Sequence, residues 1–339
     1  MNQMKSTQAF KSIGVIGGGA WGTALASLCA ANGIPTTIWA REEHVVRAIN
    51  DRHENTEYLP DVPLPTSLKA VDSLSMAAEN EALLFVVPAQ FARTTFAELR
   101  SAAGDRQQPV ALCSKGIERD TGLLMTEVLS AVWPEALPAV LSGPSFARDV
   151  AMGLPTAVTL ACANEELGKS WMATIGAPHF RPYLSDDLTG AELGGAVKNV
   201  LAIAAGVVAG QGMGESARAA LIARGFSEFQ RLGVALGAEA QTMAGLSGLG
   251  DLILTASSPQ SRNMSLGIEL GKGRSLDDVL ASRNSVSEGV ATAGAIHALA
   301  EKAGIDAPIC AAVAELVSGS RNVDDIIAAL LARPFTTEA

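Results

Sequence analysis

The sequence predicts an α/β N-terminal domain with a mostly parallel, doubly wound, Rossmann-like sheet, followed by an all-α C-terminal domain. Three observations lead to this fold class. An apolar run at 12–16 leads directly into a glycine-rich turn and an apolar helix. Similar short runs recur up to residue 183, as expected for buried strands of a parallel sheet. From Thr189 onwards, Ala-rich segments with helical periodicity replace them.

The elements of the first half follow from these runs and from the residues that end them. Gly33 supplies the left-handed position after the first helix, and Pro88 ends the third strand. The predicted strands are 12–16, 36–39, 81–87, 110–113, 139–141, 156–161 and 178–183, and the predicted helices are 23–32 and 165–175.

The glycine-rich turn at 17–22 has the pattern Gly-x-Gly-x-x-Gly between a strand and a helix. Gly17 permits the tight turn, Gly19 lets a pyrophosphate approach the backbone amides, and Gly22 lets helix and strand touch. A purely structural glycine turn is the alternative. The strands on both sides favour a nucleotide site, so we predict that residues 1–187 form a dinucleotide-binding domain.

The end of the second strand indicates which dinucleotide binds. An Asp or Glu at this position recognises the ribose of NAD. This chain has Arg41 there, and the carboxylates Glu42 and Glu43 come only afterwards. A guanidinium suits the 2′-phosphate of NADP, so the sequence favours NADP over NAD. A surface arginine, or a Glu42 that turns inward, remains the alternative.

Two further strand ends are expected to line the ligand crevice, because carboxyl ends of parallel strands do so. Lys115 follows the fourth strand, and the turn at 142–147 follows the fifth. Lys115 is therefore placed to meet cofactor or substrate, with a solvated loop lysine as the alternative.

The second half, residues 188–339, is predicted to form an all-helical substrate and catalytic domain, with the boundary near Asp187. Strand signals vanish there and Ala-rich helical patterns follow. The predicted helices are 189–209, 215–236, 239–246, 251–257, 262–271, 275–281, 288–303 and 308–318.

Lys198 lies on a helical stripe whose other members are all small, among them Gly194, Gly195 and Ala202. Two glycines inside a helix cost roughly 1 kcal/mol each relative to Ala. We therefore expect that another backbone packs closely on this face, or that a ligand does and Lys198 points at it. A lysine that reaches water beside a tight helix contact is the alternative.

Two helix starts carry polar residues. Asp251 opens one helix with Thr255 one turn later, and a simple N-cap explains Asp251 equally well. Ser261, Arg262 and Asn263 open another helix, where free amides, the helix dipole and a guanidinium make a phosphate site. The alternative is an ordinary capped helix with a solvated Arg262.

The composition sets limits on function. The chain has 339 residues, of which 48% are hydrophobic and 18% charged, which suggests two well-packed domains. The net charge of -10 argues against nucleic acid and acidic membranes as partners. The longest apolar run, 200–210, is shorter than a bilayer span, so we expect no integral membrane association.

Cysteine and histidine usage points away from metals and disulfides. The cysteines are far apart and form no CxxC pair, so we expect no metal site and a reducing, cytoplasmic location. The histidines have no Ser, Asp or metal-ligand neighbours at useful spacing, which moves attention to lysine as the acid or base. These residues are Cys29, Cys113, Cys162 and Cys310, and His44, His53, His179 and His297.

From about residue 12 to 320 the motifs, in order, resemble the NAD(P)-dependent glycerol-3-phosphate dehydrogenases of the soluble bacterial type. The matching segments are Gly-Gly-Gly-Ala-Trp-Gly-Thr-Ala-Leu at 17–25, Tyr-Leu-Pro at 58–60, Ser-Lys-Gly at 114–116, Ser-Gly-Pro-Ser-Phe-Ala at 142–147, Gly-Gly-Ala-Val-Lys-Asn at 194–199, Gly-Leu-Gly-Asp at 248–251 and Gln-Ser-Arg-Asn at 260–263.

The resemblance implies reversible reduction of dihydroxyacetone phosphate to sn-glycerol 3-phosphate for phospholipid synthesis, by a homodimer. By motif position, Lys198 is the catalytic acid/base, assisted by Lys115 and Asp251. The implied substrate-binding residues are Lys115, Gly143, Ser145, Lys198, Asn199, Asp251, Ser261, Arg262 and Asn263. The implied cofactor-binding residues are Gly17, Gly19, Ala20, Trp21, Gly22, Arg41, Tyr58, Lys115, Ala147, Arg262, Val286 and Glu288.

Two positions depart from the family pattern. Ala20 stands where a serine is common, which removes one possible hydrogen bond to phosphate, and Ser287 stands where valine is frequent. In the expected mechanism a protonated Lys198 stabilises charge on the carbonyl oxygen and gives up its proton. Lys115 is expected to lower the pKa of Lys198, and Asp251 to hold the ammonium in place.

Two other functions fit the same layout. A two-domain dehydrogenase of hydroxy acids could pair Arg262 with a carboxylate. A non-catalytic redox sensor would keep the glycine turn, but would need neither Lys198-Asn199 nor Arg262-Asn263.

Overall fold

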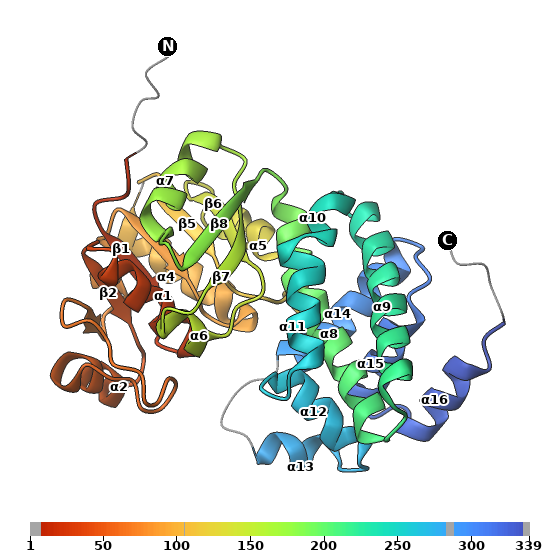
Figure 1. Ribbon diagram of the computed structural model, residues 1–339. Helices are drawn as coiled ribbons and strands as arrows, with labels where there is room; N and C mark the ends of the chain where they lie inside the picture. The colour runs from red at the N-terminus through yellow and green to blue at the C-terminus, as the bar shows by residue number, and fades with distance from the viewer. Residues whose placement is uncertain (1–7, 105, 283–287, 335–339) are drawn as a thin grey trace.

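The computed structural model describes residues 8–104, 106–282 and 288–334, and these form two parts side by side (Figure 1). The N-terminal part is a sheet covered by helices on both faces, and the C-terminal part is built of helices. Helix α8 (Leu188–Gly210) leaves the sheet and runs through the middle of the helical part. The predicted fold class is confirmed.

The sheet found in these residues has eight strands in the order β3-β2-β1-β4-β5-β6-β7-β8. Neighbouring strands are parallel, except that β6 and β7 are antiparallel. The order reverses between β1 and β4, where such sheets bind their ligands. The strands are β1 Ile13–Ile16, β2 Thr36–Trp39, β3 Lys69–Val71, β4 Ala82–Phe85, β5 Pro109–Leu112, β6 Leu137–Ser142, β7 Thr156–Ala161 and β8 Phe180–Ser185.

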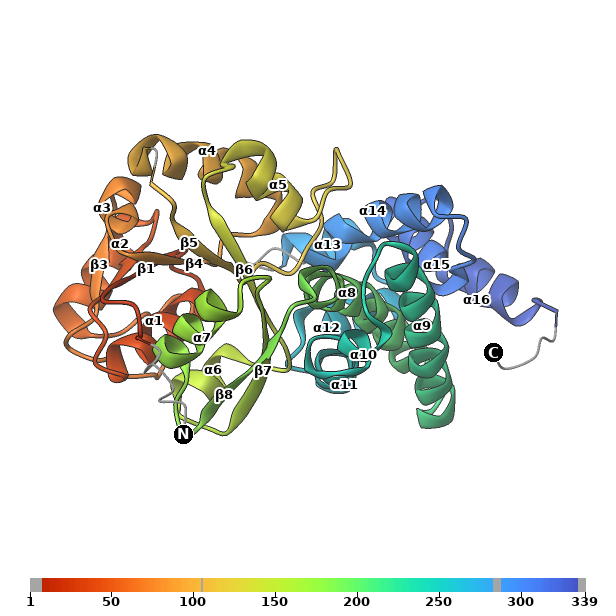
Figure 2. The ribbon, with the colours of Figure 1, turned by 90° about the horizontal axis from the view of Figure 1, so that it is seen from above.

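Helices cover both faces of the sheet (Figure 2). One face carries α1, α6 and α7, and the other carries α3, α4 and α5. The central strands β1 and β4 are buried along their whole length, which explains why their sequences are continuously apolar. The helices of this part are α1 Ala20–Ala31, α2 Glu43–Arg47, α3 Leu74–Ala78, α4 Ala92–Ala103, α5 Met125–Val132, α6 Ala147–Ala151 and α7 Glu165–Ile175.

The helical part is organised around α8, which packs against α9, α10, α11, α12, α14 and α15. A π-helical turn, Leu246–Gly250, precedes α11. The remaining helices are α9 Glu215–Ala235, α10 Ala240–Ala244, α11 Asp251–Ser257, α12 Arg262–Gly271, α13 Leu276–Ala281, α14 Glu288–Lys302, α15 Pro308–Ser318 and α16 Val323–Leu331.

The small residues of α8 let other backbones approach closely, which confirms one of the two expectations for this stripe. A Cβ at Gly194 would lie 2.3 Å from the Ser247 carbonyl oxygen, and one at Gly206 would lie 2.2 Å from the Met264 carbonyl oxygen. Only glycine fits such contacts, and the close packing offsets the intrinsic cost of glycine in a helix.

By length and composition, α8 is the one helix in the described residues that could cross a membrane. The apolar run 200–210 is the second half of this longer helix, which begins at Leu188. Nevertheless, 89% of its most apolar window is buried inside the protein. Its hydrophobicity is that of a core helix.

Several elements differ from the prediction. Strand β3 and helices α2 to α6 and α16 were not predicted; they are mostly short and only partly buried. The helix predicted at 239–246 ends at Ala244, because the backbone then enters the π-helical turn. The strand predicted at 81–87 spans Ala82–Phe85 and ends before Pro88.

Candidate active site

Three charged side chains meet where the sheet part and the helical part adjoin. Lys198 on α8 donates from Nζ to Asp251 Oδ1 (2.5 Å) and to Thr255 Oγ1 (3.0 Å). Lys115, after β5, donates from Nζ to Asp251 Oδ2 (2.7 Å) and to the Gly143 carbonyl oxygen (3.1 Å). A single carboxylate therefore bridges two ammonium groups that come from opposite sides of the junction.

The local structure explains how these groups come together. Asp251 opens α11 and is fully buried, but its carboxylate does not cap the helix, so the simple N-cap interpretation is wrong. A Cβ at Gly195 would lie 3.1 Å from both Lys115 Cγ and Ser142 Oγ. Because Gly195 has no Cβ, the stem of Lys115 can lie against α8, one turn from Lys198.

Burial sets the proton affinity of Lys198. Loss of hydration lowers its pKa to about 8, Asp251 opposes this shift, and the positive charge of Lys115 adds to it. The effects of Lys115 and Asp251 are as expected from the sequence, but the largest cause, burial, was not anticipated. An ammonium with such a pKa exchanges its proton readily near neutral pH.

Two hydrogen-bonded asparagine side chains, Asn199 and Asn263, connect this cluster to α12. Asn263 Nδ2 donates to Asn199 Oδ1 (2.8 Å), and Asn199 Nδ2 donates to the Lys115 carbonyl oxygen (3.2 Å). Ser261 caps α12 by accepting from the Met264 amide (3.2 Å), as predicted. The two asparagine side chains hold the start of α12 in a fixed relation to Lys115.

Positive charge gathers at the same place. Arg262 is exposed in the first turn of α12. Glu288 at the start of α14 is partly exposed; the loss of hydration of its carboxyl group raises its pKa, and Arg262, Lys115 and Lys198 partly reverse that shift. Three cations thus lie close enough to act on one carboxyl group. Val286, predicted beside Glu288, lies outside the described residues.

The glycine turn has the shape that a pyrophosphate requires. Gly17 has φ of +124°, and a Cβ at Gly22 would lie 1.9 Å from the Gly17 carbonyl oxygen. Gly19 is the N-cap of α1; no side chain caps this helix start, and a Cβ there would meet nothing within 4 Å. Open space in front of uncapped amides fits an anion. Ala20 and Trp21 begin α1 beside this space.

Asn55, which was not predicted as a site residue, stabilises this turn. Asn55 is buried, and its Nδ2 donates to the Gly18 carbonyl oxygen (2.9 Å) and to Thr23 Oγ1 (2.8 Å). It also accepts from the Tyr58 amide (3.2 Å). The only sequence signal was the nearby Tyr-Leu-Pro motif at 58–60.

The region beyond β2 carries mixed charges. Arg41 has a largely exposed side chain that pairs with Glu42 at 3.7 Å. Burial raises the pKa of Tyr58 to about 12, with Glu57 and Glu42 adding to the shift and Arg41 opposing it. Arg41, Glu42 and Tyr58 are therefore neighbours. Arg41, which was predicted to bind the 2′-phosphate of NADP, lies beside the carboxylate of Glu42.

The remaining predicted residues lie around the turn after β6. Ser145 donates from Oγ to the Gly143 carbonyl oxygen (3.1 Å), which also accepts from Lys115, and Ala147 begins α6. The structure brings Lys115, Gly143, Ser145, Asn199 and Asp251 into one hydrogen-bonded group with Lys198 and Asn263. Thr255, noted only for its spacing in the sequence, belongs to this group through Lys198.

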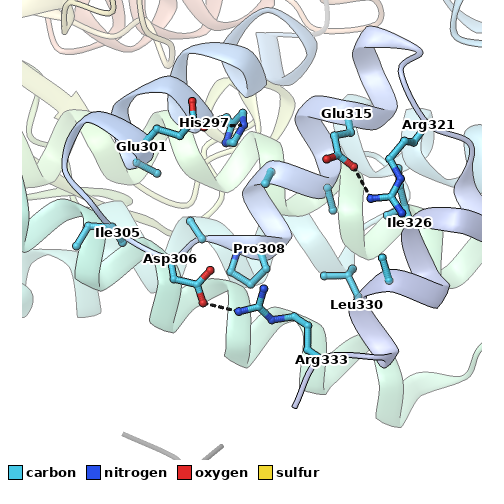
Figure 3. Close-up of a pocket in the computed structure, with 15 residues that line it drawn as sticks. His297, Glu301, Ile305, Asp306, Pro308, Glu315, Arg321, Ile326, Leu330 and Arg333 are labelled. Carbon is cyan, nitrogen blue, oxygen red and sulfur yellow. Dashed lines mark hydrogen bonds and ion pairs between the residues drawn. The ribbon is translucent and has the colours of Figure 1, made fainter. Parts of the chain in front are cut away.

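A separate cleft lies between α14, α15 and α16 and shares no residue with this group (Figure 3). Its floor is apolar, including Pro308 and Leu330. Charged side chains on its rim form ion pairs, Asp306 with Arg333 and Glu315 with Arg321. Among the described residues that line this cleft there is no lysine, in contrast to the site at the junction.

A Gly-x-Gly-x-x-Gly turn between β1 and α1, and two lysines that share the Asp251 carboxylate where the sheet part meets the helical part, are typical of a dehydrogenase that uses a nicotinamide dinucleotide. Comparison with known proteins agrees with this class. The chain matches the family described as NAD-dependent glycerol-3-phosphate dehydrogenase, with the N-terminus at residues 12–168 and the C-terminus at 187–328.

Relatives match nearly the whole length of the chain. Glycerol-3-phosphate dehydrogenase [NAD(P)+] of Parvibaculum lavamentivorans is 56% identical over 98% of this chain and 99% of its own, and that of Caulobacter vibrioides is 54% identical over 97% and 99%. The crystal structure of glycerol-3-phosphate dehydrogenase from Coxiella burnetii has a TM-score of 0.91 at 36% identity, covering 96% of this chain and 99% of that one. The chain belongs to the NAD(P)-dependent glycerol-3-phosphate dehydrogenase family, whose members are oxidoreductases.

Proposed function

We propose that this protein reversibly reduces dihydroxyacetone phosphate to sn-glycerol 3-phosphate with NADPH or NADH. One observation carries the proposal: the buried Lys198 ammonium, whose pKa is lowered, shares the Asp251 carboxylate with Lys115 where the sheet part and the helical part adjoin. The names and high identity of the relatives support the same substrate.

Lys198 acts as the acid in the reduction. When bound, the nicotinamide supplies a hydride to the ketone carbon, and negative charge grows on the carbonyl oxygen. The Lys198 ammonium stabilises that charge and transfers its proton to the oxygen. Asp251 and Thr255 fix the direction of the Nζ group, and in the reverse reaction neutral Lys198 takes the proton back.

The substrate phosphate is held at the start of α12. Arg262 supplies the guanidinium, and Asn263 and the amides after Ser261 supply donors to an anion. Holding the ketone between this phosphate site and Lys198 lowers the activation free energy of the reaction by several kcal/mol. Further substrate contacts come from Lys115, Gly143, Ser145, Asn199 and Asp251.

The carboxyl edge of the sheet would hold the dinucleotide. Gly17, Gly19 and Gly22 would receive its pyrophosphate, and Arg41 would select the 2′-phosphate, so NADP would be preferred over NAD. The remaining contacts come from Ala20, Trp21, Tyr58, Lys115, Ala147, Arg262, Val286 and Glu288.

The same proposal extends to the organisation of the protein. The dinucleotide-binding domain is residues 1–187, and the substrate and catalytic domain is residues 188–339. This boundary is consistent with the family match, whose N-terminal part ends at residue 168 and whose C-terminal part begins at residue 187. The enzyme acts in the cytoplasm as a homodimer and supplies glycerol 3-phosphate for phospholipid synthesis.

A substrate panel tests the proposed activity. Oxidation of NADPH and of NADH is followed by absorbance with dihydroxyacetone phosphate, with unphosphorylated dihydroxyacetone and with 2-keto acids. The proposal predicts turnover with the phosphorylated ketone, and a preference for NADPH. Turnover of a 2-keto acid in place of the phosphorylated ketone would assign the protein to the hydroxy-acid dehydrogenases instead.

A further inference from the structure

A buried carboxylate outside the active site joins the helical part to the sheet part. Glu192 lies on α8, six residues before Lys198, and is buried. Its Oε1 accepts from the Thr126 amide (2.9 Å) and its Oε2 from Thr126 Oγ1 (2.6 Å). Thr126 belongs to the first turn of α5, which covers the sheet (Figure 2). The pair therefore joins the helical part to the sheet part.

This contact is chemically matched. The first turn of a helix has unpaired amides and a partial positive charge, so a carboxylate there is favourable. Burial still penalises the charged form and raises the pKa of Glu192 to about 7, partly offset by the bonds from Thr126, while the charge of Glu127 raises it further. An apolar residue would avoid this cost, so a buried carboxylate here calls for a specific role.

The geometry provides that role. Six residues of helix separate Glu192 from Lys198 by about 9 Å along the axis. Between them, Gly195 packs against Lys115 and Ser142, the residues at the carboxyl edge of the sheet. Near Lys198, α8 is held to the sheet part by the Gly195 contact, by the bond from Asn199 to the Lys115 carbonyl oxygen and by packing on β6 and β7. The bonds between Glu192 and Thr126 hold the helix about two turns earlier, and two attachments along one rigid helix fix its angle to the sheet.

We propose that Glu192 is a positioning residue, which through Thr126 holds α8 at the angle that places Lys198 against the reacting ketone. The inference rests on the proposed role of Lys198, which a Lys198→Ala variant tests separately. If Glu192 proves dispensable, the role of Lys198 is untouched. If Lys198 is dispensable, both fall.

Glu127 offers a matched control at the same helix end. Its Oε2 accepts from the Leu124 amide (2.7 Å), so it also stabilises the start of α5, but it lies on α5 itself and does not reach α8. Glu127→Ala therefore removes a cap from this helix without loosening the junction. Glu192→Gln keeps the shape and one acceptor oxygen of Glu192, and serves as the conservative variant.

The readouts are kcat, the KM for NADPH, and the primary deuterium isotope effect with C4-deuterated NADPH. A displacement of the order of 1 Å can slow chemistry by about 10²-fold. We expect Glu192→Ala to lower kcat by between ten- and a hundredfold and raise the isotope effect, with the KM for NADPH within about twofold. Glu127→Ala is expected to lower the melting temperature with kcat unchanged, and Glu192→Gln to restore most of the activity.

Equal kcat and isotope effect in Glu192→Ala and Glu127→Ala would overturn the proposal. If Glu192→Ala does not fold, Thr126→Val decides, because it removes only the hydroxyl donor to Glu192. We expect it to lower kcat about tenfold, with recovery in Thr126→Ser. Wild-type kcat in Thr126→Val would then count against a positioning role.

Discussion

The substitution Asp251→Asn removes the charge that balances two ammonium groups while keeping the shape of the side chain. In the wild type, the Asp251 carboxylate lies 2.5 Å from Lys198 Nζ and 2.7 Å from Lys115 Nζ and is fully buried. The neutral amide leaves Lys198 buried beside a second cation. The charged form of Lys198 then loses the carboxylate that stabilises it.

The size of the effect follows from Coulomb's law. Opposite unit charges about 4 Å apart attract by about 4 kcal/mol at an effective dielectric constant of about 20. At about 1.4 kcal/mol per pKa unit, losing this attraction lowers the pKa of Lys198 by two to three units. Starting from about 8, the Lys198 of the variant is then largely uncharged at neutral pH.

The assay is the pH dependence of kcat/KM for ketone reduction. Reduction needs protonated Lys198, so in the wild type the rate is expected to fall as pH rises through about 8. In Asp251→Asn we expect this fall to move two to three units lower, with a loss of about 10²-fold at pH 7.5. Glu228→Gln, at a buried carboxylate on α9 that accepts from the Ile309 amide, serves as the control. An Asp251→Asn profile with its midpoint still near 8 would refute the assigned electrostatics.

Three further predictions address packing, cofactor choice and pH. Gly194→Ala places a Cβ 2.3 Å from a carbonyl oxygen and is expected to destabilise the fold by about 1–3 kcal/mol. Gly294→Ala, at a helical site with open space, is expected to stabilise the fold slightly. The free energy of unfolding in urea, measured for both variants, checks this. Arg41→Ala is expected to raise the KM for NADPH at least tenfold and leave that for NADH nearly unchanged, and equal changes would argue against a 2′-phosphate contact. Because the folded-state pKa of Glu192 is raised from 4.5 to about 7, its stabilising contribution is complete below pH 4.5 and is lost as pH rises through 7. The difference in melting temperature between the wild type and Glu192→Gln is therefore expected to change between pH 5 and 8. The wild type should be less stable relative to the variant at pH 8, where the charges of Glu192 and Glu127 repel each other. Parallel curves of melting temperature against pH would contradict this.

The fold was predictable where the signal is local. The turn at 17–22, the apolar strands and the long helices each carry their pattern within a dozen residues, and the glycine stripe on α8 correctly indicated close backbone contact. Strand β3 was not predictable, because three residues at the sheet edge show no period. The helix end at Ala244 depends on a π-helical turn that no propensity marks.

The site was predictable as a set of residue types, but its electrostatics were not. Lys198 and Asp251 are 53 positions apart, and Asp251 has the sequence appearance of an N-cap. Only the fold shows that its carboxylate serves two lysines instead. Likewise, Glu192 and Thr126 belong to no motif, and their contact exists because α8 packs beside α5 in three dimensions.

The most direct measurement is a single-turnover reaction of Lys198→Ala, in which enzyme saturated with NADPH is mixed with saturating dihydroxyacetone phosphate. A group that donates the proton contributes roughly 10²–10⁴-fold, so we predict a hydride-transfer rate lower by that factor. The Kd for NADPH should stay within about twofold of wild type, because the pyrophosphate site is on the sheet. A single-turnover rate near that of the wild type would contradict the central role given to Lys198.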